Sequence, residues 1–309
     1  MWNNKRFHSL NYALKEEFGE KIYKVSLDGG FTCPNRDGKV GSRGCIFCSD
    51  AGSGEYAGSR SRSITEQIEE QLILISKKFP EGRVIAYFQN FTNTYGDIEY
   101  LESIYREALA HPRVAGLAIA TRPDALPSDV IDLLTDIHRE HYLWIELGLQ
   151  TMHDHTAELI NRGYDLEVFH SSVKKLVERG IKVVTHLIVG LPGECREDIL
   201  KSVEYINSIG VWGVKIHLLH IIKDTALHRM YEKVKFRVME EQEYIDLVCD
   251  MIAILHEDIV IHRLTGDGSR DTLIAPIWSL NKRRVLNSID KRLKERDVAQ
   301  GDEKKFLFF

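Results

Sequence analysis

The sequence predicts an α/β fold in which six parallel strands alternate with helices, followed by a mostly helical C-terminal extension. Short runs of aliphatic and β-branched residues alternate with segments whose apolar residues recur at helical spacing. Polar motifs such as TRPD, GLQT and GLPGE follow directly on these runs. Because the active sites of parallel (β/α) barrels lie at the carboxyl ends of the strands, we expect the functional residues along that edge of the sheet.

The predicted elements divide the chain into three parts. An amphipathic helix that includes Phe7 is expected within residues 1–20, and the core covers residues 21–235. The strands of the core are expected at residues 21–28, 83–89, 114–121, 142–150, 181–191 and 213–222, with helices at 63–78, 129–138 and 168–179 among their connections. Because helical segments separate the strands, the sheet should be parallel, either open or closed into a barrel.

The third part, residues 236–309, is expected to pack on the core. It should hold a helix ending near His256, a strand at 258–264 and a terminal helix at 278–296. One stripe of the terminal helix is apolar and should dock, whereas its flanks carry the basic residues Lys282, Arg283, Arg284, Lys291, Arg292, Lys294 and Arg296. Basic flanks suit contacts with the phosphates of a nucleic acid, and a merely solvated face is the alternative.

Composition narrows the class of protein. The chain has 309 residues, of which 43% are apolar and 28% charged, as in ordinary globular proteins. It has no apolar run of about 18 residues and no secretory signal, so we expect a cytoplasmic protein with no membrane partner. Thiols stay reduced there, so clustered cysteines should bind metal or react. The net charge of −5 means that an RNA partner would have to meet a local basic face.

Three of the five cysteines lie in one glycine-rich segment, residues 29–58. Cys33, Cys45 and Cys48 have the spacing C-x11-C-x2-C, and no histidine lies among them. A structural zinc site needs four ligands. Three thiolates instead suit a [4Fe–4S] cluster with one iron left open for a substrate or cofactor. Zinc with a distant fourth ligand is the alternative.

Several motifs resemble those of the radical S-adenosylmethionine (SAM) superfamily. Phe47 precedes the last cysteine of the loop, and TRPD, ELGLQT, NRGYD and HLIVGLPGE follow in the order found in Elp3-type enzymes. The resemblance is greatest to the short bacterial Elp3-like family, through CPNRDG, TNTY, KIHLLH and HRLTGDG, and it covers nearly the whole chain. The spacing of eleven residues departs from the C-x3-C of most of the superfamily.

The resemblance implies a partial (β/α)6 radical SAM barrel with a [4Fe–4S] cluster on Cys33, Cys45 and Cys48. The open iron would bind the amino and carboxylate groups of S-adenosylmethionine. An electron from a donor of the flavodoxin or ferredoxin type would cleave this cofactor to a 5′-deoxyadenosyl radical. The protein side chains would orient the cofactor and exclude competing reactions.

Candidate contacts of the cofactor lie at the ends of the strands. Gln89, Thr92 and Asn93 stand where the family has a glycine-rich segment that contacts the methionyl amine, and an ordinary polar turn is the alternative. Glu146 and Gln150 share one face of their strand. A barrel core would prefer apolar residues there, so this face indicates a site.

The resemblance also assigns roles to individual residues. Gln150 resembles the position that contacts the ribose, and Arg162 resembles the basic residue near the cofactor carboxylate, with a surface ion pair as the alternative. Leu187 and Gly190 would approach the adenine, unless GLPGE is only a tight connection.

Lys215 and His217 share one face of the last core strand, which suggests catalytic residues that contact the substrate. A histidine satisfied within the core is the alternative.

The resemblance implies a tRNA substrate. Elp3-type relatives act on the wobble uridine of tRNA, and the short bacterial family is associated with the aminomethyluridine pathway. The leading hypothesis is conversion of 5-carboxymethylaminomethyluridine to 5-aminomethyluridine. One alternative is a radical SAM enzyme that acts on a small molecule or a protein. Another is a non-enzymatic, zinc-stabilised RNA-binding module.

Overall fold

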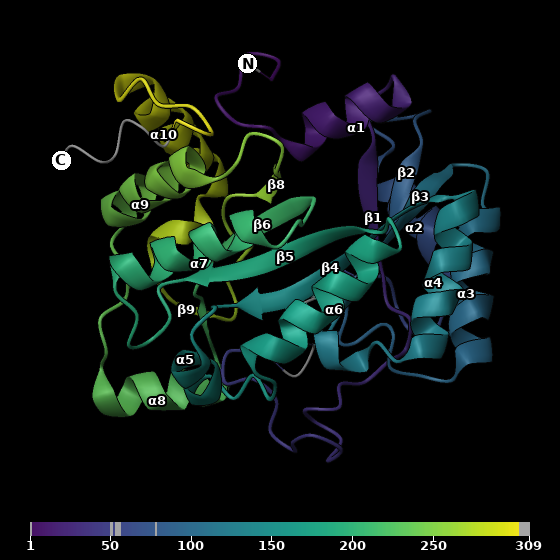
Figure 1. Cartoon of the computed structure of the whole chain (residues 1–309), viewed down its shortest axis with the longest axis horizontal. Helices are drawn as coiled ribbons and strands as arrows, with labels where there is room; N and C mark the ends of the chain where they lie inside the picture. Colours follow the sequence, from purple (N-terminus) through teal and green to yellow (C-terminus); the bar gives the residue numbers. More distant parts are fainter. Residues whose placement is uncertain (1, 50–51, 53–56, 78, 303–309) are drawn as a thin grey trace.

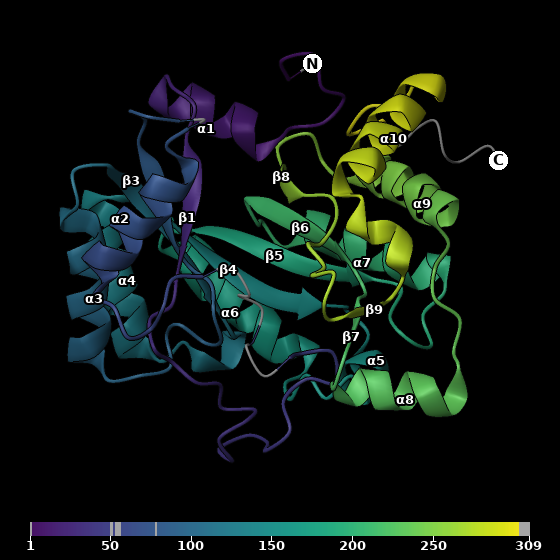
Figure 2. The same cartoon turned by 180° about the vertical axis from the view of Figure 1, so that it is seen from behind.

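A computed structural model describes residues 2–49, 52, 57–77 and 79–302. Seven parallel strands form one sheet in the order β1-β2-β3-β4-β5-β6-β8. Their bounds are β1 Tyr23–Leu27, β2 Val84–Phe88, β3 Val114–Thr121, β4 Tyr142–Gln150, β5 Lys182–Val189, β6 Gly213–Leu218 and β8 Val260–Arg263. The sheet is curled into a half-barrel with crossover helices along its outer face (Figures 1 and 2). The α/β class and the parallel sheet are therefore confirmed.

Ten helices surround the sheet in the described part of the chain: α1 Leu10–Phe18, α2 Ile64–Ile75, α3 Ile98–Ala110, α4 Ser128–Glu140, α5 Asp154–Leu159, α6 Leu166–Glu178, α7 Arg196–Ser208, α8 Ala226–Val234, α9 Glu241–Ile254 and α10 Lys282–Glu295. Side-chain caps set several of their starts. Ser63 and Glu66 form a reciprocal capping box at α2, and Asp97 and Asp165 cap α3 and α6. No described helix has both the length and the apolar composition needed to span a bilayer.

Two predicted elements differ from the structure. Helix α1 begins at Leu10 because the Ser9 hydroxyl caps it, so Phe7 precedes the helix. The last predicted core strand ends at Leu218, and its remainder forms β7 (Ile221–Ile222), which pairs with β9 (Leu273–Ala275) in a separate antiparallel ribbon.

Strand β8 adds a seventh strand to the six that were predicted for the sheet. It comes from the segment expected at 258–264 and pairs in parallel with β6. The stretch between the two strands is long enough for a crossover, and it contains α8 and α9. The division of the chain at residue 235 stays a prediction, although the sheet itself continues past that point.

Helix α10 docks as predicted, and part of its basic flank pairs with acidic residues. Its apolar stripe is fully buried. The flanks form the ion pairs Arg284–Glu241 at 2.6 Å, Arg292–Asp246 at 2.5 Å, Arg296–Asp250 at 2.5 Å and Lys282–Asp267 at 2.5 Å. Three of these four acidic partners lie on α9. Helix α9 therefore neutralises part of the flank, whereas Arg283, Lys291 and Lys294 are exposed, so phosphate binding along the flank stays a prediction.

Candidate functional site

A cavity of about 460 Å³ opens among the carboxyl ends of the strands. Its lining runs from Ser26 on β1 to Asp267 beyond β8, and β7 contributes Ile222. At the opposite end of the sheet interior, α1 inserts Leu14 among Ile85 and Trp144. The cavity therefore lies toward the functional edge, as the positions of the polar motifs predicted.

The cysteine loop is held to the segment that follows β4. Asn35 Nδ2 donates to the carbonyl of Asn161 at 2.7 Å, and Asn161 Nδ2 donates in return to the carbonyl of Gly44 at 2.6 Å. The backbone N–H of Ile46 donates to the carbonyl of Ile160 at 3.0 Å. Gly44 has a φ of +69°, a conformation that other residues rarely adopt. The loop thus has a defined shape where the structure describes it, although none of those residues is in a helix or a named strand.

The thiols of Cys33, Cys45 and Cys48 all line the cavity. Burial, together with the neighbouring Cys48 and Cys33, raises the pKa of the Cys45 thiol to about 12. Three thiolates would therefore need a positively charged group between them. In the described part of the chain, no three His, Cys, Asp or Glu side chains converge on a point that could hold one metal ion. Three thiols in one loop are the ligand number of a [4Fe–4S] cluster with one open iron, whereas a structural zinc site needs four ligands.

The structure brings together nine of the thirteen predicted site residues. Those that line the cavity are Cys33, Cys45, Cys48, Gln89, Thr92, Glu146, Gln150, Lys215 and His217. Among the described groups, Thr92 Oγ1 is buried and has no hydrogen-bond partner. Gln150 has a φ of +65°, a strained conformation that is common at binding sites. Both residues therefore suit contact with a bound molecule.

Four predicted residues do not line the cavity. Asn93 Nδ2 donates to the carbonyls of Phe88 and Ala120, which joins the ends of β2 and β3. Leu187 faces the core on the outer side of the sheet, whereas its neighbours His186 and Ile188 line the cavity. Gly190 lies just beyond β5, and Arg162 is the fourth such residue. Cofactor contacts by these residues stay predictions.

Arg162 is buried, with 1% of the residue exposed, but its guanidinium does form an ion pair, with the Asp154 carboxylate at 3.3 Å. Its guanidinium donates to the carbonyls of Leu149 and Thr151, each at 2.7 Å, and to that of Tyr164 at 2.9 Å. These bonds fix the turn after β4, so Arg162 supports the shape of the cavity from behind its wall.

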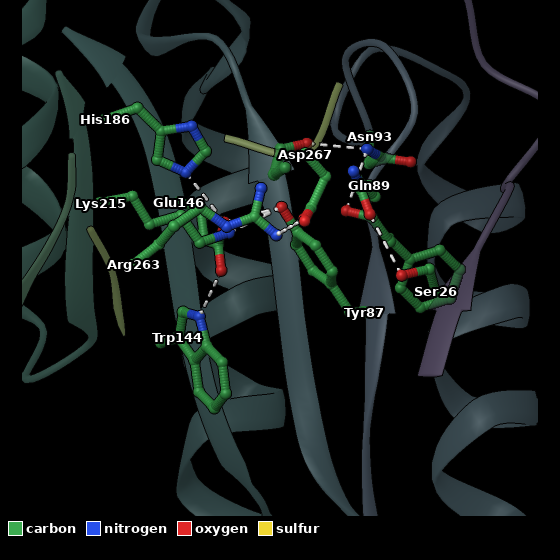
Figure 3. A network of polar contacts seen from close by, with 12 residues as sticks. Ser26, Tyr87, Gln89, Asn93, Trp144, Glu146, His186, Lys215, Arg263 and Asp267 are labelled. Carbon is green, nitrogen blue, oxygen red and sulfur yellow. Dashed lines mark hydrogen bonds and ion pairs between the residues drawn. The ribbon is translucent and has the colours of Figure 1, made fainter. Parts of the chain in front are cut away.

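Glu146 is the centre of a buried polar network on the floor of the cavity (Figure 3). Its carboxylate accepts from Tyr87 Oη at 2.8 Å, from Trp144 Nε1 at 3.0 Å and from His186 Nε2 at 2.9 Å. It also accepts from Lys215 Nζ, which in turn contacts the Tyr87 hydroxyl. Burial opposes ionisation of Glu146, but the Lys215 ammonium and His186 outweigh it and hold the pKa of that carboxyl well below its usual value.

Sequence reasoning missed Tyr87, His186 and Lys24 as members of this network. Tyr87 lies in an apolar run, VIAYF, where an aromatic residue is typical of any strand. The available signal was strand alternation, since His186 and Ile188 share a face of β5 as Glu146 and Gln150 share one of β4. Only the pairing of the strands shows that these faces meet.

Four partly buried histidines, of which His186, His217 and His220 line the cavity, should make the fold sensitive to acid. Burial, above all, lowers the pKa of His186 and of His220 to about 4, and it lowers those of His217 and His262 well below the usual 6.5. The unfolded chain therefore takes up protons at a higher pH than the folded chain. Stability should fall as the pH drops from about 6.5 toward 4, by about 1.4 kcal/mol per pH unit for each histidine.

Urea unfolding between pH 7.5 and 5 measures this dependence. A His217→Asn variant should have a shallower slope, by about one proton, because one buried histidine is gone. A stability that stays flat over this range in the parent protein would contradict the prediction.

Comparison with known proteins agrees with this geometry. The family model described as the radical SAM superfamily matches residues 37–206, and that of the Radical_SAM C-terminal domain matches residues 211–295. An uncharacterized protein of Bacillus subtilis, YtqA, is 46% identical over 297 residues, which cover 96% of this chain and 92% of YtqA. A tRNA uridine(34) acetyltransferase of Methanocaldococcus infernus is 26% identical over 73% of this chain and 44% of its own length.

Among solved structures, the Elp3 protein of Methanocaldococcus infernus has a similar fold. The TM-score is 0.70 at 18% sequence identity, and the match covers 90% of this chain and 64% of that one.

Proposed function

The chain belongs to the radical SAM superfamily of enzymes, and from that premise we propose that it modifies the wobble uridine of tRNA. Membership implies a [4Fe–4S] cluster and S-adenosylmethionine as cofactors. It also removes the non-enzymatic zinc-stabilised module from the alternatives. One observation carries the proposal: a single cavity joins the cysteine loop to Lys215 and His217, so cofactor and substrate can meet in it.

We assign the cluster to Cys33, Cys45 and Cys48, all three of which line the cavity. When bound, the cluster and S-adenosylmethionine supply a radical that abstracts a hydrogen atom from the substrate, and a flavodoxin or ferredoxin would provide the electron. Thr92 and Gln150 would orient S-adenosylmethionine, since both line the cavity and Thr92 Oγ1 has no hydrogen-bond partner among the described groups.

The relatives support tRNA as the substrate. One of them is named as an acetyltransferase of tRNA uridine 34, the wobble position, and the Elp3 structure shares the fold. The proposed reaction removes the carboxymethyl group of 5-carboxymethylaminomethyluridine and leaves 5-aminomethyluridine. A tRNA substrate also implies a cytoplasmic enzyme.

The proposed reaction is a two-electron oxidation followed by hydrolysis. The carbon between the amine and the carboxylate loses two electrons, and water adds to it. The C–N bond then breaks, which gives the primary amine and glyoxylate. S-adenosylmethionine would be the oxidant of the overall equation and would be consumed to methionine and 5′-deoxyadenosine, with one proton released. The electron first supplied by the flavodoxin or ferredoxin would be regained from the substrate, so it does not appear in that equation. Atoms, electrons and charge balance in this overall equation.

His217 and Lys215 are the residues of this chain that we place beside the substrate. Burial keeps His217 neutral by lowering its pKa, so its ring can accept a proton from the amine or from the attacking water. Lys215 contacts the Glu146 carboxylate on the floor of the cavity, and this contact opposes the effect of burial, which lowers the pKa of the lysine.

The nucleoside composition of tRNA in a deletion strain tests the function. Loss of the gene should deplete 5-aminomethyluridine and its products at the wobble position, and 5-carboxymethylaminomethyluridine should accumulate. The parent gene should restore the profile and a His217→Ala gene should not, whereas a Cys195→Ala gene should, because Cys195 is exposed and outside the cavity lining. An unchanged profile, with S-adenosylmethionine cleavage intact in the purified protein, would indicate a small-molecule or protein substrate.

A further inference from the structure

The floor of the cavity holds more positive than negative charge. Glu146 faces two ammonium groups, because Lys215 contacts it directly and Lys24 also interacts with it. Both ammonium groups lie over the same ring, at 4.4 Å and 4.9 Å from the centroid of Tyr87. Among the described groups, Glu146 therefore faces two lysines, of which Lys215 is buried and Lys24 is partly buried.

At the mouth of the cavity, too, one carboxylate faces two positively charged side chains. Asp267 pairs with Arg263 at 3.1 Å and with Lys282 at 2.5 Å. Of these two cations, only Arg263 lines the cavity. Burying a charge is costly unless an opposite charge accompanies it, so this side of the cavity is suited to a further anion.

Two imidazoles on this side each have a ring nitrogen with no hydrogen-bond partner among the described residues. His217 Nε2 and His220 Nε2 are buried and have no hydrogen-bond partner among the described residues, and both histidines line the cavity. Gly266 lies against His220, where a Cβ would come within 3.0 Å of the ring. Glycine thus keeps the space beside His220 open.

We propose that Lys215, His217, His220 and Arg263 form an anion pocket that binds a carboxylate of the substrate. A guanidinium can hold a carboxylate through two parallel N–H···O bonds, and a neutral imidazole can donate a third. The inference rests on the proposed function and deepens it, because the carboxymethyl group to be removed ends in a carboxylate. The pocket would then select tRNA that carries this group over tRNA that lacks it.

A carboxylate fits this pocket better than a backbone phosphate. Lys215 is only 2% exposed and lies on the floor of the sheet interior. A phosphate in RNA carries a ribose on either side, whereas the end of a base substituent can enter a narrow cavity. We therefore identify the ligand of this pocket as a small terminal carboxylate.

Three small probes test the pocket without tRNA. N-methylglycine carries the secondary amine and the carboxylate, its methyl ester lacks the negative charge, and inorganic phosphate is a different anion. Binding to the holoprotein is measured by ligand-observed NMR for the parent and for Arg263→Gln, Arg263→Lys and Lys282→Gln. Lys282 is the matched control, because it pairs with the same Asp267 from outside the cavity lining.

We expect the parent to bind N-methylglycine and not the ester, and Arg263→Gln to weaken that binding about tenfold or more. Arg263→Lys should recover part of the affinity, and Lys282→Gln should bind like the parent. If the Arg263→Gln variant bound N-methylglycine as tightly as the parent does, or if the parent bound the ester as tightly as N-methylglycine, the proposed anion pocket would be overturned. Phosphate that binds as tightly as N-methylglycine would overturn the carboxylate assignment. Should the tRNA profile stay unchanged while these expectations hold, the pocket stands and the tRNA reaction fails.

Discussion

Alanine at Cys33, Cys45 or Cys48 is expected to abolish both iron retention and the cleavage of S-adenosylmethionine. The parent protein, purified without oxygen and reconstituted with iron and sulfide, should hold about four irons per chain. All three thiols line the same cavity in a loop whose shape depends on the bonds between Asn35, Asn161 and Gly44. With only two protein thiolates left, the cluster loses one of its three anchors. Iron analysis, the visible spectrum and 5′-deoxyadenosine formation with dithionite measure the effect.

Cys195→Ala and Cys249→Ala are the matched controls. Cys195 is exposed at the start of α7, and Cys249 is buried within α9, so neither thiol can reach the cavity. Both variants should keep the cluster. One zinc per chain without iron uptake in the parent would contradict the assignment, and so would iron loss in the controls equal to that of the loop variants.

Glu146→Gln is expected to destabilise the fold by about 3 kcal/mol, because it leaves the Lys215 ammonium buried beside a neutral group. The change also creates a hydrogen-bond conflict. Tyr87, Trp144, His186 and Lys215 all donate to the carboxylate. An amide has one oxygen to accept and an NH₂ group that would face donors. Urea unfolding at pH 7.5 measures the loss.

The sign of the pH dependence of the cost of Glu146→Gln follows from the lowered pKa of Glu146. Since the folded carboxyl ionises at a lower pH than the unfolded one, its stabilisation is complete above the unfolded pKa and is lost as the pH falls through the folded value. The cost of Glu146→Gln should therefore be greatest at neutral pH. Glu102→Gln is the control, because Glu102 pairs with Arg106 on the surface of α3 and should contribute little. Similar losses of unfolding free energy in the two variants would contradict the prediction that the buried network stabilises the fold more than a surface ion pair does.

The pattern of apolar and polar residues within short segments was sufficient to predict most of the fold. The predicted strands at 114–121 and 142–150 match β3 and β4 at both ends, because apolar runs bounded by polar turns are local signals. Strand β8 was recognised as a strand, but its place in the main sheet was not predicted. Partner choice depends on contacts between segments far apart in the chain, such as β6 with β8.

The features of the site likewise fall into those that the sequence predicted and those that only the tertiary structure showed. The sequence alone determined the three-cysteine loop, the strand-end motifs and the inward face shared by Glu146 and Gln150, because each depends on spacing within a few residues. Only the tertiary structure decided that Tyr87, His186 and Lys215 meet at Glu146, that Arg162 is buried, and that acidic residues of α9 pair with part of the basic flank of α10. The physical reason is that the charge balance of a buried group depends on which strands and helices meet, and residue spacing along one element carries no information about that.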